Sequence, residues 1–219
     1  MQFTTNQKSI FAGIALAILA TLIWSGNFVI ARGVYKIIPP VSLAFYRWLT
    51  ASVIIFPIGI RSFMAERKII WQHRSYFFWV SLSGVTLFNT CIYIAGHYVT
   101  AINLALIGTT SSPVFAIILA AIFLGEKITG MRMLGLGLCI AGILLLLSKG
   151  HTDNLLSFKF STGDLFILAG ALCFAVYSVL VKRKPAGVSG VNFLFVIFIL
   201  FILAMFIIEN WLIIIDFFF

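Results

Sequence analysis

Seven long apolar runs are the feature that most limits how this chain can fold. A transmembrane helix needs about 20 predominantly apolar residues to cross the hydrocarbon core of a bilayer. None of the runs alternates strictly between polar and apolar residues, as the strands of a membrane barrel do. The sequence therefore predicts an all-α integral membrane protein with about seven transmembrane helices, at Ile10–Ala31, Val41–Ile60, Tyr76–Val99, Ile102–Leu124, Met131–Ser148, Gly163–Val181 and Val191–Ile208.

The composition agrees with this interpretation and excludes two other classes of protein. Of the 219 residues, 62% are apolar and 10% are charged, whereas a soluble domain carries about 25% charged residues. A soluble enzyme with this composition would leave too much apolar surface in water, and a disordered tail would not be so apolar. The lipid bilayer is therefore an expected partner. The net charge of +9 does not indicate nucleic-acid binding, because Lys and Arg lie between the runs, where they set membrane topology.

The distribution of these basic residues predicts a cytoplasmic N-terminus. Cytoplasmic segments of membrane proteins are enriched in Lys and Arg. With the N-terminus inside, ten of the 15 basic residues fall on the cytoplasmic side, four fall on the other side, and Arg47 lies within a run. The cytoplasmic ten are Lys8, Arg61, Arg67, Lys68, Arg74, Lys127, Arg132, Lys182, Arg183 and Lys184. Seven spans then leave the C-terminus on the outer side.

A faint internal repeat appears when the sequence is shifted by 150 residues. The shift lays the first run on the sixth, and it aligns Gly13 with Gly163, Leu22 with Leu172, Val29 with Val179, Trp24 with Phe174 and Arg32 with Lys182. Because the second copy begins five spans after the first, an odd number, it is inverted in the membrane. Inverted repeats are a feature of many secondary transporters.

Several short motifs follow one another in a distinctive order between Phe11 and Leu147. They are Trp24-Ser25-Gly26-Asn27-Phe28, Pro40 followed by Arg47, Thr100-Ala101 with Ala105, Ser111-Ser112-Pro113-Val114-Phe115, Leu124-Gly125-Glu126-Lys127, and Gly135 with Gly142. In this order and spacing the motifs resemble the EamA-type repeat of the drug/metabolite transporter superfamily, and the resemblance resumes at Gly163.

That resemblance implies ten helices in two inverted five-helix repeats, a central substrate cavity, and alternating access in the inner membrane. This chain departs from the plan, because its second repeat holds two helices and Ile197 stands where a counterpart of Arg47 is expected. We therefore expect a complete repeat over residues 10–148, a linker over 149–162 and an incomplete repeat over 163–219. The tail from Trp211 to Phe219 is too short for an eighth span, and we interpret the chain as a truncated form.

Arg47 is the candidate substrate-binding residue with the strongest physical reason. It lies about six residues, or roughly 9 Å, from the start of the second predicted helix. A charge at this depth costs several kcal/mol unless it is paired or hydrated, so it marks a functional site by default. Two interpretations are open. Arg47 holds an anionic group of a substrate, or its long stem reaches the outer headgroups or bonds carbonyls within the bundle.

The other candidate substrate-binding residues are Trp24, Asn27, Asn89, Ser112 and Pro113. Asn27, Asn89 and Ser112 belong to a set of neutral polar residues at mid-membrane depth, together with Ser25, Ser83, Thr90, Thr109, Thr110 and Ser111. This set suits a zwitterionic or polyhydroxylated solute, or else it bonds helix to helix. Pro113 frees a carbonyl near Thr109 and so favours a kink at a cavity, although prolines also occur in spans without such a role. Trp24, like Tyr46 and Trp48, either lines a cavity or anchors the membrane interface.

Other patterns favour structure over chemistry. Two stripes of small residues predict close helix packing: Gly108, Ser112, Ala116 and Ala120 in the fourth run, and Gly135, Cys139 and Gly142 in the fifth. Glu126 is expected to pair with Arg132 at the cytoplasmic surface or to take part in gating. No His, Cys, Asp or Glu residues have the spacing of a metal or catalytic site. The sequence therefore predicts no enzymatic activity, no metal and no cofactor.

Taken together, these features predict a secondary transporter that moves a small polar metabolite by alternating access. Amino acids or related carboxylates are the favoured substrates, because Arg47 is the only charge expected to be buried, well inside a run. The alternative is a transport-inactive fragment or subunit that acts only by pairing, either as a homodimer or with another half-transporter.

Overall fold

The computed structural model describes residues 5–34, 36–148 and 161–218, and every regular element in these ranges is a helix. The elements are α1 (Thr5–Gly33), α2 (Pro40–Gln72), α3 (Arg74–Ser81), the π-helix η1 (Leu82–Leu87), α4 (Phe88–Tyr98), α5 (Ala101–Leu124), α6 (Gly130–Ser148), α8 (Thr162–Lys182) and α9 (Gly190–Phe218). Five helical segments are long and apolar enough to cross a membrane, with α3, η1 and α4 counted as one, and two shorter apolar helices lie in α6 and α9. The all-α membrane fold with about seven spans is confirmed.

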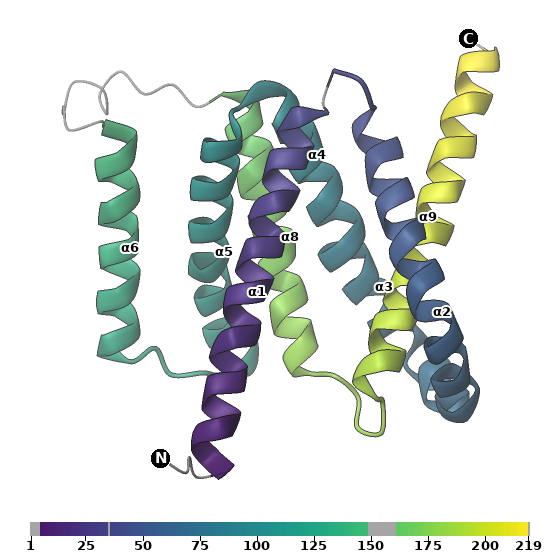
Figure 1. Ribbon diagram of the computed structural model, residues 1–219, viewed down its shortest axis with the longest axis horizontal. Coiled ribbons are helices and arrows are strands. Elements are labelled where there is room, and N and C mark those ends of the chain that lie inside the picture. The colour runs from purple at the N-terminus through teal and green to yellow at the C-terminus, as the bar shows by residue number, and fades with distance from the viewer. Residues whose placement is uncertain (1–4, 35, 149–160, 219) are drawn as a thin grey trace.

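The spans alternate in direction along the chain (Figure 1). The start of α1, the α2–α3 junction, and the connections α5–α6 and α8–α9 lie at one end of the bundle. The segments that carry the ten basic residues predicted to be cytoplasmic therefore meet at that end, which is called the basic end below. α1 and α8 run in opposite directions, as do α2 and α9. This is the relation that an inverted repeat requires.

Two helices continue well beyond the apolar runs that predict them. The second run ends at Ile60, but α2 continues to Gln72 through a basic segment that contains good helix formers such as Arg61, Glu66 and Lys68. α9 likewise continues past Ile208 to Phe218, so the tail extends this helix. Hydropathy marks where a helix leaves the apolar layer and not where the backbone stops being helical.

The core lies between α2, the third span, α8 and α9. α8 packs along α4 and α5, and α9 packs along α2. Two glycines allow the close approach of α8 to α4, because a Cβ at Gly163 would lie 2.7 Å from the side chain of Val99, and a Cβ at Gly170 would lie 3.2 Å from that of Cys91. Ser161 caps the start of α8 and forms a capping box with Asp164, which satisfies two of the free N–H groups at the helix start.

α6 lies at the edge of the bundle and packs on α5 (Figure 1). Its described side chains are exposed, except for the half-buried Leu136. The predicted packing of the stripe on this helix is wrong for contacts within the described residues, because a Cβ at Gly135 or Gly142 meets no atom within 4 Å and Cys139 is exposed. The predicted linker falls mostly on residues 149–160, outside the described residues.

Candidate functional site

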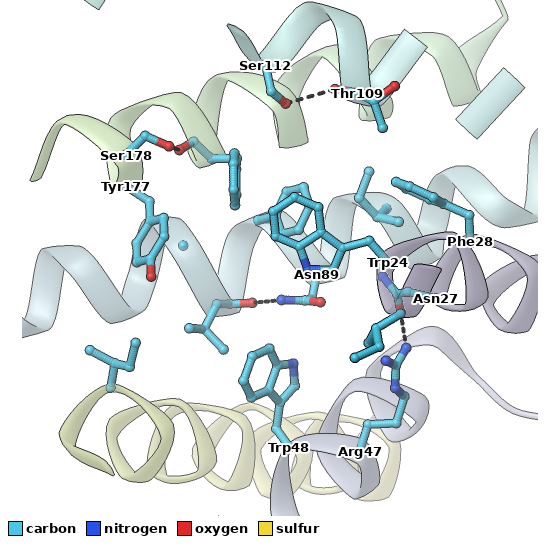
Figure 2. Close-up of a pocket in the computed structure, with 18 of the residues that line it drawn as sticks. Trp24, Asn27, Phe28, Arg47, Trp48, Asn89, Thr109, Ser112, Tyr177 and Ser178 are labelled. Carbon is cyan, nitrogen blue, oxygen red and sulfur yellow. Dashed lines mark hydrogen bonds between the residues drawn. The ribbon is translucent and has the colours of Figure 1, made fainter. Parts of the chain in front are cut away.

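A cavity of about 770 Å³ lies among six spans, which are α1, α2, η1 with α4, α5, α8 and α9. Its volume is in the range of sites for small molecules. All six candidate residues from the sequence, Trp24, Asn27, Arg47, Asn89, Ser112 and Pro113, line this cavity (Figure 2). The structure thus brings together residues that are up to 89 positions apart in the sequence, between Trp24 and Pro113. Their roles in binding a substrate stay predictions.

The guanidinium of Arg47 is the charged group on the cavity wall. Arg47 Nη1 donates one hydrogen bond to Asn27 Oδ1 of α1 and another, 2.8 Å long, to Tyr93 Oη of α4. Tyr93 Oη in turn donates to Asn27 Oδ1 at 3.3 Å. The ring of Tyr93 also lies near the cation, with 5.7 Å between Arg47 Cζ and the ring centroid. Three helices therefore meet at one half-buried cation.

The partners of Arg47 are neutral. Among the described residues, the two ion pairs within 4.0 Å both involve Glu126 and neither involves Arg47. A neutral amide oxygen and a phenol hydroxyl satisfy donors of the guanidinium but supply no opposite charge. Because a cation inside the membrane is costly, an anion that reaches this site gains an interaction that the protein does not already provide.

The neutral polar residues mostly bond to their own helices. The hydroxyls of Thr109 and Ser112 donate to the carbonyls of Ala105 and Gly108, at 2.5 and 2.8 Å. Ser25, Ser83, Thr110 and Asn89 do the same one turn back in their own helices. The interpretation that these groups bond helix to helix is therefore wrong for these six residues. Thr109, Ser112 and Asn89 nevertheless line the cavity.

Aromatic rings form much of the remaining wall. Trp24 and Phe174, the pair that the internal repeat aligns, meet edge to face with ring centroids 6.0 Å apart. Phe174 also packs on Phe88 of α4, at 5.0 Å. Trp48 packs on Phe198 of α9, at 4.7 Å. Of the two interpretations of Trp24 and Trp48, the structure has both lining the cavity (Figure 2).

Sequence reasoning missed Tyr93, the buried partner of Arg47, and several residues that line the cavity. Tyr93 is 2% exposed and joins Arg47 to Asn27, yet a tyrosine near the end of a span looks like an ordinary interface anchor. Tyr177 and Ser178 of α8 also line the cavity, and no motif identified them. Gly84 lies in η1, where a Cβ would be 2.1 Å from the ring of Tyr177. A π-helical turn often marks a functional position in a helix, but the sequence carries no clear signal for one.

The basic end of the bundle carries a second group of charges, built around Glu126. Glu126 Oε1 accepts from Lys182 Nζ at 2.5 Å, and Glu126 Oε2 accepts from Arg132 Nη1 at 3.2 Å. Arg183 also donates to the carbonyl of Phe123, near the C-terminal end of α5. The predicted pair with Arg132 is present, while the link to Lys182 joins α5 to α8. Hydrogen bonds from Lys182 and then Arg132 lower the pKa of Glu126 below its ordinary value.

No metal site is apparent in the described part of the chain, where no three His, Cys, Asp or Glu residues lie close enough together to hold an ion. The cavity combines one cation, a few neutral hydrogen-bonding groups and apolar rings.

The chain matches the model of the EamA-like transporter family over residues 11–148. It is 34% identical to an uncharacterised transporter of Archaeoglobus fulgidus over 75% of this chain and 55% of that protein. It is 27% identical to the uncharacterised transporter YyaM of Bacillus subtilis over 78% of this chain and 56% of that protein. An S-adenosylmethionine uptake transporter of Rickettsia felis is 22% identical over 86% of this chain and 60% of its own length.

The chain thus spans little more than half the length of these relatives. No solved structure matches it significantly.

Proposed function

The chain belongs to the EamA-like transporter family, and on that premise we propose that it moves a small metabolite with a carboxylate group through the described cavity by alternating access. The observation that carries the proposal is Arg47, a cation on the cavity wall whose recorded partners are neutral. A carboxylate accepts charge-assisted hydrogen bonds from a guanidinium, and these are about twice as strong as those between neutral groups.

The other cavity groups support a metabolite that is small and only partly polar. The rings of Trp24, Trp48 and Phe174 favour an apolar portion of the substrate, and the Asn89 amide oxygen accepts a hydrogen bond from an amino or hydroxyl group. Amino acids and related carboxylates fit this combination. The name of the Rickettsia felis relative refers to a metabolite that carries a carboxylate, which agrees with the proposal but does not decide the substrate.

The membrane placement is part of the same proposal. The protein is a multi-pass membrane protein, and we propose that the basic end faces the cytoplasm of a cell whose inner membrane holds it, with the N-terminus inside. Arg47 lies seven residues after Pro40, the first residue of α2. It is therefore near the end of that helix that faces away from the basic end. The carboxylate then binds in the outer half of the membrane.

The test uses the purified chain in proteoliposomes with a panel of labelled acetate, benzoate, L-leucine, L-phenylalanine and L-glutamate. We expect saturable flux of at least one of these over empty vesicles. Arg47→Leu is expected to reduce that flux about 100-fold or more, since removing one partner of a buried charged pair costs about 2–5 kcal/mol. The matched control is Arg67→Leu, an exposed arginine near the far end of the same helix, which should leave the flux unchanged.

Three results contradict the proposal. They are equal flux in the Arg47→Leu variant, equal flux of the corresponding carboxamides, and no flux of any panel member. In the last case, crosslinking in the same vesicles tests whether the chain acts as a subunit. Flux that appears only on mixing with a second half-transporter would favour pairing.

A further inference from the structure

We infer that Asn27 competes with the substrate for Arg47. The amide oxygen of Asn27 occupies the position at the guanidinium that a carboxylate oxygen of the substrate takes, and the two oxygens exchange in each transport cycle. This inference rests on the proposed function, because it requires that Arg47 binds the transported anion. It assigns Asn27 a competing role and Tyr93 a positioning role.

The exchange follows from the unequal strength of the two acceptors. Arg47 Nη1 donates to the amide oxygen of Asn27, which carries no net charge. A carboxylate oxygen that accepts the same hydrogen makes a charge-assisted bond of about twice the strength. A substrate carboxylate therefore displaces Asn27 once it reaches the guanidinium.

Tyr93 stays in place while Asn27 leaves. Its side chain is 2% exposed and packs in the core of the bundle, and its hydroxyl accepts from Arg47 Nη1 at 2.8 Å. The hydroxyl hydrogen now points to Asn27 Oδ1, at 3.3 Å. After the exchange the same hydrogen is available to the carboxylate. Tyr93 thus keeps the guanidinium on the cavity wall and contributes one donor to whichever oxygen is present.

Asn27 lies on a helix that buries few of its described side chains. Phe28 is the one buried side chain among the described side chains of α1, and the others are half-buried or exposed. Arg32, one turn further on, donates to the carbonyls of Gly96 and His97 in α4, at 2.8 and 3.3 Å. When Asn27 leaves Arg47, α1 loses a hydrogen bond to α2 while Arg32 still holds it to α4. Substrate arrival is thereby coupled to the separation of α1 from α2.

Equilibrium binding of benzoate, L-leucine and L-phenylalanine to the full chain in detergent tests the inference, with tryptophan fluorescence as the readout. Asn27→Ala removes the competing acceptor, so the Kd should fall about 5- to 10-fold. Asn27→Asp places a carboxylate beside Arg47, so the Kd should rise at least 30-fold. Asn27→Ser, whose hydroxyl lies one bond nearer the backbone than the amide oxygen, is the second variant should the alanine protein not fold. Tyr93→Phe, which loses only the hydroxyl, should raise the Kd about fivefold.

Flux separates this role from a structural one. Asn27→Ala should lower KM and also lower Vmax, because the bond that returns α1 to α2 is missing. Weaker binding in both Asn27→Ala and Asn27→Asp overturns the inference, since it makes Asn27 a direct ligand or a packing residue. If the wild-type chain binds none of these three carboxylates and neither acetate nor L-glutamate, or if Arg47→Leu binds the same carboxylate as well as the wild type does, the proposed function itself fails.

Discussion

The two ends of the bundle hold their cations in opposite ways. At the basic end, Lys182 and Arg132 share the carboxylate of Glu126, and the two cations are exposed while the carboxylate is half-buried, with 52%, 51% and 31% of their side-chain surface accessible. In the other half, Arg47 is half-buried and bonds to an amide oxygen and a phenol hydroxyl. At the basic end two cations share a carboxylate, whereas the hydrogen-bond partners of Arg47 are neutral.

On the proposed function, this difference explains why Arg47 and not the basic end meets the substrate. Exposed ion pairs contribute about 0–1 kcal/mol to stability, because water already solvates both partners. They are well suited to forming and breaking as helix ends move. A cation within the membrane without a carboxylate is costly to maintain, so its retention requires a compensating partner. On the proposal above, that partner is the transported anion.

The largest expected effect is that of removing the charge of Arg47. Arg47→Gln keeps a neutral hydrogen-bond donor in the side chain, but the charge is gone. Carboxylate flux in proteoliposomes should fall about 100-fold, whereas Glu126→Gln at the other end should change it less than about fivefold. Similar losses in the two variants would mean that the two ends do not differ in the way argued here.

A smaller effect is expected at Gly84, which lines the cavity between the two ends of the bundle. A methyl group at Gly84 would lie 2.1 Å from the ring of Tyr177, so Gly84→Ala must displace that ring. Overpacking of this kind costs about 1–3 kcal/mol, which thermal unfolding in detergent measures. Gly135→Ala on α6 is the matched control, because its methyl group meets no atom within 4 Å. The prediction fails if the two variants unfold at the same temperature.

Much of the fold could be predicted from the sequence, since each span must be apolar to dissolve in lipid. The ends of the helices could not be predicted in the same way. A helical segment outside the apolar layer, such as the part of α2 after Ile60, does not need to be apolar and so carries no hydropathy signal. The six candidate residues all lie on one cavity, since polar or proline residues at mid-membrane depth are rare and tend to face the interior of the bundle. Which of them bind a substrate stays a prediction.

Partners across helices are harder to predict. Tyr93 meets Arg47 only because α4 and α2 pack in one register, and Lys182 meets Glu126 across 56 positions of sequence. Neither pairing leaves a local pattern, since tyrosine and lysine near span ends usually have interfacial roles. The π-helix at Leu82–Leu87 is likewise set by the packing of its neighbours.

A charge exchange at the basic end is expected to have a modest effect that can be reversed. Glu126→Lys places a third cation beside Lys182 and Arg132, and this repulsion should loosen the contact between α5 and α8. We expect flux to change about three- to fivefold, in line with the small energies of exposed pairs. Adding Lys182→Glu restores opposite charges and should return the flux toward that of the wild type, with the Kd for carboxylate unchanged throughout. Absence of rescue in the double variant would argue against a direct interaction.

The smallest effect concerns the pH dependence of stability at the same end. The pKa of Glu126 is lowered from its ordinary value of 4.5 by hydrogen bonds from Lys182 and Arg132. A carboxyl group with a lowered pKa in the folded state stabilises that state above its unfolded pKa, and the stabilisation is lost as the pH falls through the folded pKa. Thermal unfolding in detergent between pH 7 and about pH 3 should therefore show a slightly larger loss for the wild type than for Glu126→Gln, because the glutamine variant has no proton to gain. Parallel curves for the two proteins would show that Lys182 and Arg132 do not form ion pairs with Glu126 in solution. The basic end would then lack the ion pairs that distinguish its cations from Arg47.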